Sequence, residues 1–67
     1  MPKARVVFRQ LQRDGWRIIR QRGSHRFLGK DERRGTFAYH DGKDLGNQEL
    51  RFVADEFGYT VEELRNL

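Results

Sequence analysis

The residues best suited to chemistry in this 67-residue chain form one short segment, Arg22-Gly23-Ser24-His25-Arg26. The segment joins a flexible glycine and a small hydroxyl to an imidazole that exchanges protons near neutral pH, with a cation on either side. Such a set suits acid–base chemistry on a phosphodiester, with His25 moving the proton and the arginines holding the phosphate. The blander interpretation is a Gly-Ser turn followed by a surface histidine, and the segment alone does not decide between them.

The second histidine, His40, contributes only if the strands bring it close to His25. Pairing residues 24–30 with residues 35–40 across a four-residue loop, 31–34, sets the two histidines opposite each other. A neutral imidazole would then accept the proton of an RNA 2′-hydroxyl, and a protonated imidazole or an arginine would assist the leaving oxygen. A slip of one residue would put the histidines on opposite faces. The alternative for His40 is a strand-end residue without a chemical role.

The sequence does not indicate a serine nucleophile, a metal site or a disulfide. Ser24 lacks a Ser-His-Asp arrangement, and adjacent strand residues point apart, so we expect it to hydrogen-bond within the turn rather than to act as a nucleophile. Two histidines with the loop residues Asp41 and Asp44 fall short of a convincing metal site. The chain has no cysteine, which removes thiolate ligands and disulfides. The sequence therefore predicts no metal and no cofactor.

Positive charge is concentrated in the first half of the chain. Residues 1–34 carry eleven Lys and Arg against three acidic residues, whereas residues 35–67 carry three against seven. Nine of the eleven cations are arginine, which binds phosphate bidentately and stacks on bases, so we expect a polyanionic partner, RNA or another nucleic acid. The alternative is a surface that merely favours arginine. The candidate phosphate-binding residues are Arg17, Arg20, Arg22, Arg26 and Lys30.

Chain length and hydropathy limit the number of domains and argue against a membrane-spanning segment. We expect one domain over residues 1–67 with a small core, because so short a chain buries only about 60% of the surface that it exposes when unfolded. No apolar run approaches the ~18 residues that a membrane span needs, and no secretory segment follows the N-terminus. We therefore expect a chain of the cytoplasm with no membrane partner, and we expect no small-molecule cofactor.

Hydrophobic spacing predicts helices at both ends. Residues 3–14 form an apolar stripe of helical period and end at Gly15. Residues 48–57 form a second stripe, with Asn47 as N-cap and Gly58 just past the end. Thr60-Val61-Glu62-Glu63 has the capping-box pattern and predicts a short terminal helix.

Aromatic and β-branched residues predict three strands between the helices, at 16–20, 25–30 and 36–40, with a charged turn at 31–35 and a loop at 41–44. Trp16 is expected in the core rather than as a base-stacking residue. An antiparallel sheet of this size must bury one apolar side, so the sequence predicts an α+β fold in the order α-β-β-β-α with both helices on one face.

Short motifs in a fixed order cover nearly the whole chain, from about residue 7 to residue 64. They are Leu11-x-x-Asp14-Gly15-Trp16; Gly23-Ser24-His25 with Phe27; His40 with Gly42-Lys43-Asp44-Leu45; and Leu50-Arg51, Val53, Gly58 and Glu62-Glu63. Together they resemble the HicA-type toxins of HicA–HicB toxin–antitoxin modules. The resemblance implies a fold like the double-stranded-RNA-binding domain, an mRNA-cleaving toxin whose essential histidine corresponds to His25, and a HicB-like antitoxin that masks the site.

Three positions depart from the family pattern. Arg26 stands where family members often carry His or another aromatic residue, Ala38 stands where they often carry proline, and Gln48-Glu49-Leu50 replaces Gly-Thr-Leu at the start of the last helix. The first departure affects substrate preference and the third affects partner contacts. Because His25 is kept, we expect an active toxin.

The leading hypothesis is thus a metal-independent endoribonuclease toxin with His25 as acid–base catalyst and His40 as a second candidate. Arg22 and Arg26 hold phosphate, Gly23 lets the backbone approach the substrate, and Ser24 orients the site. The first alternative is a non-catalytic RNA-binding module, which predicts salt-sensitive binding that hardly depends on His25. The second is a small basic domain that binds an acidic protein and has no affinity for RNA.

Overall fold

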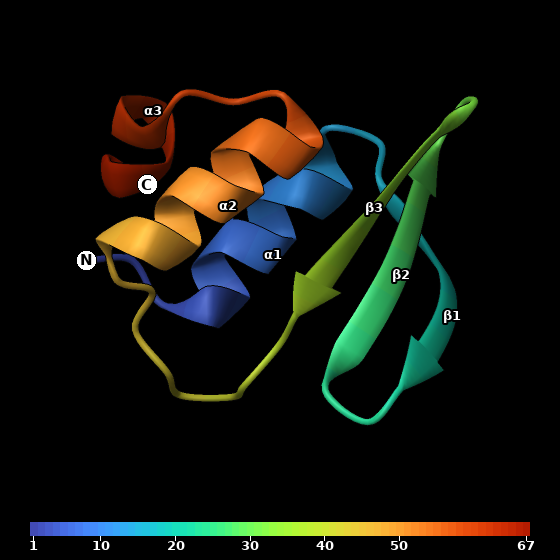
Figure 1. Cartoon of the computed structure of the whole chain (residues 1–67), viewed down its shortest axis with the longest axis horizontal. Coiled ribbons are helices and arrows are strands. Elements are labelled where there is room, and N and C mark those ends of the chain that lie inside the picture. The colour runs from blue at the N-terminus through green and yellow to red at the C-terminus, as the bar shows by residue number, and fades with distance from the viewer.

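Three antiparallel strands form one layer of the molecule and the helices form a second layer against it (Figure 1). A computed structural model describes all residues, 1–67. The elements in chain order are α1 (Ala4–Arg13), β1 (Arg17–Arg22), β2 (His25–Lys30), β3 (Arg33–Ala38), α2 (Asn47–Phe57) and α3 (Val61–Arg65). This order confirms the predicted α-β-β-β-α fold with a short C-terminal helix.

Helix α1 forms because its apolar residues recur on one face. Its buried residues are Ala4, Val7, Phe8 and Leu11. The helix ends where Gly15 takes a φ of 101°, a left-handed conformation that only glycine adopts without strain. Arg5 and Arg9 remain exposed on the opposite face. The structure confirms the predicted helix to within one residue at each end.

Helix α2 begins one residue earlier than predicted. Its N-cap is Gly46 rather than Asn47, and the Glu49 side chain accepts a hydrogen bond from the Gly46 N–H at 2.8 Å. The Glu49 side chain, from the first turn of the helix, thus satisfies the free N–H of Gly46, although Gly46 itself has no side chain that could cap the helix. Gly58 ends α2 with a φ of 85°, and Thr60 caps α3 through the predicted capping box.

The strands lie in the order β1-β2-β3, with β2 in the centre. The connection between β2 and β3 is shorter than predicted, since Lys30 pairs directly with Arg33 and leaves a two-residue turn. Asp31 occupies a left-handed conformation in this turn, with a φ of 54°. The charged residues Arg33 and Arg34 extend β3 instead of forming a loop, because an exposed edge strand tolerates charge.

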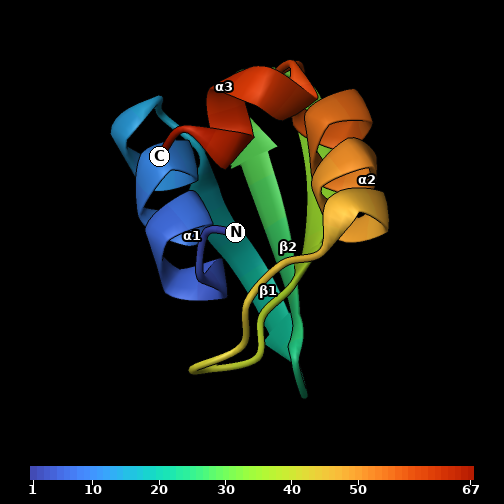
Figure 2. The ribbon, with the colours of Figure 1, turned by 90° about the vertical axis from the view of Figure 1, so that its left-hand side faces the viewer.

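Both long helices cover the same face of the sheet, and α3 lies across one end of them (Figure 2). We call this covered side the inner face and the uncovered side the outer face. Between the layers lies one core of 13 buried residues drawn from all three helices, from β2 and β3, and from the segments between elements. Trp16 is 2% exposed and packs edge-to-face on Phe57 with 4.8 Å between ring centroids, which confirms its predicted place in the core.

No helix has the length and the apolar composition that crossing a membrane requires.

Candidate active site

The turn between β1 and β2 places His25 at the start of β2. Arg22 pairs with His25 across the turn, so Gly23 and Ser24 are its two connecting residues. Gly23 has a φ of 58°, where any other residue would be strained. The backbone carbonyl of Ser24 accepts a hydrogen bond from the Tyr39 N–H at 2.7 Å, which attaches the turn to the residue after β3. The predicted Gly-Ser break is confirmed.

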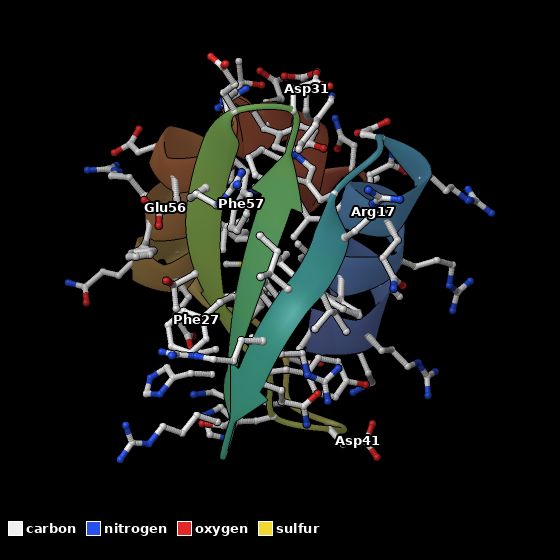
Figure 3. All side chains as sticks on the ribbon, turned by 90° about the vertical axis from the view of Figure 1, so that its right-hand side faces the viewer. Arg17, Phe27, Asp31, Asp41, Glu56 and Phe57 are labelled. Carbon is white, nitrogen blue, oxygen red and sulfur yellow. The ribbon has the colours of Figure 1, made fainter.

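Strand alternation puts His25 on the outer face. Leu28 and Phe37 belong to the core, so their neighbours at odd spacing point away from the helices. Opposed residues then form three rows across the outer face of the sheet. These rows are Arg22–His25–Ala38, Arg20–Phe27–Thr36 and Arg17–Gly29–Arg34. Figure 3 looks onto this face and shows Arg17 and Phe27 on it.

The prediction that His25 lies opposite His40 is wrong. His25 pairs with Ala38, two residues earlier, because the turn before β3 has two residues instead of four. His40 follows β3 in the loop that leads to α2, and it is exposed. The two histidines are therefore not cross-strand neighbours.

His40 instead belongs to a polar group near the start of α2. Its carbonyl accepts a hydrogen bond from the Lys43 N–H at 3.1 Å, and the Lys43 ammonium lies 3.0 Å from a Glu49 carboxylate oxygen. The pKa of Glu49 is held below its usual value, first by the Gly46 N–H, then by Lys43 and in smallest measure by the charge of His40.

The five candidate phosphate-binding residues divide between the two faces. Arg17, Arg20 and Arg22 share the outer face with His25. Arg26 and Lys30 alternate with His25 along β2 and point to the inner face. The Lys30 stem passes beside Gly15, where its Cε would lie 3.5 Å from an added Cβ.

Arg26 is held between aromatic rings. Its guanidinium carbon lies 4.1 Å from the centroid of the Tyr39 ring and 5.1 Å from that of Phe8. Its Nε is buried without a hydrogen-bond partner. Cation–π attraction offsets part of the cost of removing this nitrogen from water. Arg26 therefore joins β2 to α1 and to the end of β3, directly beside His25.

An apolar groove of about 390 Å³ opens beside His25, between the β3 edge and α2. Its walls include Ala38, Leu45, Val53 and Phe52, whose side chain is left 53% exposed. A molecule that approaches His25 from the α2 side therefore meets apolar surface, whereas one that approaches along the sheet meets arginine.

Two outer-face residues were not among the predicted site residues. Phe27 carries the Arg20 guanidinium over its ring at 4.8 Å. The Arg34 guanidinium lies near Gly29 and donates from Nη1 to the carbonyls of Asp31 and Arg33, at 3.1 and 2.8 Å. Phe27 was missed because Phe27 and Leu28 are both apolar and the sequence does not show which one faces the core. Arg34 was missed because it was assigned to a turn, and a two-residue turn at Asp31-Glu32 lacks the usual glycine signal.

No group of three or more histidine, aspartate or glutamate side chains is arranged so that it could hold a metal ion.

The family model described as HicA toxin of bacterial toxin-antitoxin matches residues 4–59. The chain belongs to the HicA toxin family. The match begins with α1, includes the Gly23-Ser24 turn and all three strands, and ends just past α2. As a member of the HicA family, the chain is the toxin component of a toxin–antitoxin system and pairs with an antitoxin. Comparisons with curated proteins and with solved structures give no match.

Proposed function

We propose that this HicA-family toxin is an endoribonuclease that cleaves mRNA in the cytoplasm without a metal ion, with His25 as its acid–base catalyst. The observation that carries the proposal is the row in which His25 lies. His25 is exposed next to Arg22, on a face where the strands present four arginines and no carboxylate. A phosphodiester on this face meets cations that neutralise its charge and an imidazole that can exchange its protons.

The chemistry follows from these groups. A nitrogen of His25 takes the proton from an RNA 2′-hydroxyl, and the freed oxygen attacks the adjacent phosphorus. The bond between phosphorus and the 5′ oxygen breaks, and that oxygen takes up a proton from water. The products are a 2′,3′-cyclic phosphate and a 5′-hydroxyl, and His25 returns its proton to solvent. Arg22 stabilises the negative charge that grows on the phosphate oxygens.

The other residues act around this step. Gly23 adds no side chain to the turn, and nothing lies within 4 Å of the place that its Cβ would occupy. The RNA backbone can therefore approach the turn at this residue. Ser24 orients the turn through its carbonyl bond to Tyr39. Arg17 and Arg20 hold RNA on the outer face. Arg26 and Lys30 contribute from the inner face, Arg26 by fixing the position of β2 and Lys30 by its charge near the end of the sheet.

The test separates the two histidines. His25→Ala should abolish mRNA cleavage and growth arrest, whereas His40→Ala should retain most of both, because His40 is not paired with His25. Equal activity of the wild type and His25→Ala would overturn the catalytic role. If His25→Ala and His40→Ala lose mRNA cleavage to the same extent, His40 acts as a second proton carrier. RNA with methylated 2′-hydroxyls should resist cleavage, and EDTA should leave cleavage of ordinary RNA unchanged.

The proposed partner is a HicB-like antitoxin with an acidic surface. The outer face bears four arginines, and an acidic protein that covers them would exclude RNA by occupying the same charges. Added RNA should therefore slow binding of the antitoxin, and this competition should weaken as salt rises.

A non-catalytic RNA-binding module is the second candidate, because the arginines of the outer face would bind RNA without any use of His25. It predicts that His25→Ala binds RNA as tightly as the wild type and that neither protein cleaves it.

A further inference from the structure

The middle row of the outer face places a phenyl ring beside a guanidinium group. Phe27 lies in the centre of this row, between Arg20 of β1 and Thr36 of β3. The Arg20 guanidinium already stacks over the Phe27 ring at 4.8 Å. Nucleobases stack both on aromatic rings and on guanidinium planes, so a base can extend this existing stack.

A shallow hollow of about 490 Å³ lies against this stack. Its walls include Ile19, Arg20, Phe27, Arg34 and Thr36, all exposed or half-buried, and the Glu56 side chain of α2 closes it at the β3 edge, where it accepts the Thr36 N–H. Ile19 is the extra residue of a bulge in β1, and it is 57% exposed. Because of the bulge, two consecutive residues, Ile19 and Arg20, both lie on the outer face, and Arg20 and Arg22 share that face with Arg17. The hollow therefore combines the apolar side chains of Ile19 and Phe27 with the guanidinium groups of Arg20 and Arg34.

The third row continues the same path with cations. Arg17 and Arg34 flank Gly29, whose lack of a side chain lets Arg34 and Ile19 lie close to the sheet. A Cβ at Gly29 would lie only 3.1 Å from Arg34 Nη1 and would overlap Ile19. Successive rows along β2 are about 7 Å apart, because each row is two residues from the next. This distance is comparable to one nucleotide of an extended strand.

We propose that the outer face binds single-stranded RNA along β2, with the nucleotide next to the cleaved phosphate held in this hollow, its base stacked on Phe27 and Arg20 and its outer phosphate held by Arg17 and Arg34. The proposal rests on the ribonuclease function proposed above and adds the path and form of the substrate. Duplex RNA hides its base faces and cannot use this stack. Binding in this hollow therefore requires single-stranded RNA, although the element order α-β-β-β-α is that of a fold that binds duplex RNA.

The binding test uses an RNA oligonucleotide whose 2′-hydroxyls are methylated, so that binding is measured without cleavage. Phe27→Leu should weaken binding about tenfold, the usual scale of one lost base stack. Arg17→Gln with Arg34→Gln should weaken it further and reduce its salt dependence. The matched control is Arg5→Gln with Arg9→Gln, two exposed arginines of α1 away from the sheet. This control should change binding least, and a duplex of the same sequence should compete poorly.

The decisive measurement changes the ligand instead of the protein. Abasic sites are placed one at a time along the oligonucleotide. One of them should weaken binding to the wild type about tenfold and leave binding to Phe27→Leu unchanged, because the stack is already lost there. An abasic effect of equal size in both proteins would overturn the proposal, as would strong competition by duplex RNA.

The outcomes also separate this proposal from the function on which it rests. Cleavage that depends on His25 but is indifferent to Phe27→Leu, to every abasic site and to the Arg17 and Arg34 changes would overturn the binding path alone. Absence of any RNA binding by the wild type at low salt would overturn both.

Discussion

The guanidinium of Arg26 lies 4.1 Å from the centroid of the Tyr39 ring, where β2 begins and β3 ends. Tyr39 also donates its N–H to the Ser24 carbonyl and its hydroxyl to Asp41 at 3.2 Å. Tyr39 thereby joins the turn before His25, the loop after β3 and, through Arg26, the strand that carries His25. The position of the histidine depends on contacts made on the opposite face of its strand.

Arg26→Met tests this contact. Methionine keeps an unbranched apolar stem but removes the cation that lies against Tyr39 and Phe8. We expect the free energy of unfolding to fall by about 1 kcal/mol, the size of a desolvated cation–π contact after the gain from removing the unpaired Nε is subtracted. Arg9→Met, at an exposed position of α1, should be neutral. Urea denaturation measures both, and an unchanged midpoint for Arg26→Met would contradict the packing role.

Gly35→Ala and Gly29→Ala should differ in cost, although both would crowd a neighbour. A Cβ at Gly35 would lie 2.6 Å from Phe57 Cε1, and that ring is buried in the core and cannot move aside. A Cβ at Gly29 would overlap the tip of Ile19, which is 57% exposed and free to turn. We expect Gly35→Ala to lose about 2 kcal/mol and Gly29→Ala clearly less. Thermal unfolding compares them, and the reverse order would be inconsistent with this packing.

Tyr59→Phe should reduce stability at neutral pH and reduce it less in acid. The Tyr59 hydroxyl donates to the Asp14 carboxylate and, with Gln10, holds the pKa of Asp14 below its usual value. A carboxyl with a lowered pKa contributes stability above its unfolded pKa of about 3.9, and this contribution is lost as pH falls through the lowered folded value. We expect a loss of about 1 kcal/mol at pH 7, shrinking below about pH 4.

The control for this pH dependence is Tyr39→Phe, which removes a hydroxyl bonded to Asp41 in an exposed loop. Its effect on stability at pH 7 should be smaller than that of Tyr59→Phe. Denaturant titrations at pH 7 and pH 3 suffice, and a gap between wild type and Tyr59→Phe that widens in acid would contradict the proposed bond.

The helices were predictable because their signals are local. Each signal comes from residues that are neighbours along one helix or at its end. The signals are the apolar stripe of α1, the left-handed Gly15 and Gly58, and the Thr60 capping box. The placement of both long helices on one face followed from the need to bury one apolar side of a small sheet. None of these features requires knowledge of which residues pair between segments that are distant in the sequence.

The register of β2 with β3 was not predictable in the same way. It depends on the length of one turn, and Asp31-Glu32 carries no glycine to show that Asp31 takes a left-handed conformation. The two-residue error in this register wrongly placed His40 opposite His25 and assigned Arg34 to a turn instead of to β3. The stacking of Arg26 depends on Phe8 and Tyr39, which come from segments distant in sequence. Such contacts appear only after the segments have been packed.

Glu56 protects the free edge of the sheet, and Glu56→Ala should expose it. β3 is an edge strand, and the Thr36 N–H on its free side donates to Glu56 Oε2 at 2.9 Å. Figure 3 shows Glu56 beside this edge. An unpaired edge donor is a template for pairing with another chain. We expect Glu56→Ala to lose about 1 to 2 kcal/mol of stability and to self-associate more than the wild type.

The matched control for this edge is Asp55→Ala, which removes the same charge from the adjacent exposed residue of α2 and touches no strand donor. Its stability and its apparent mass in size-exclusion chromatography should stay close to the wild type. Glu56→Gln should lie between the two, because its amide oxygen still accepts from Thr36 but without charge. If Glu56→Ala behaves like Asp55→Ala in both measurements, the carboxylate does not protect the β3 edge.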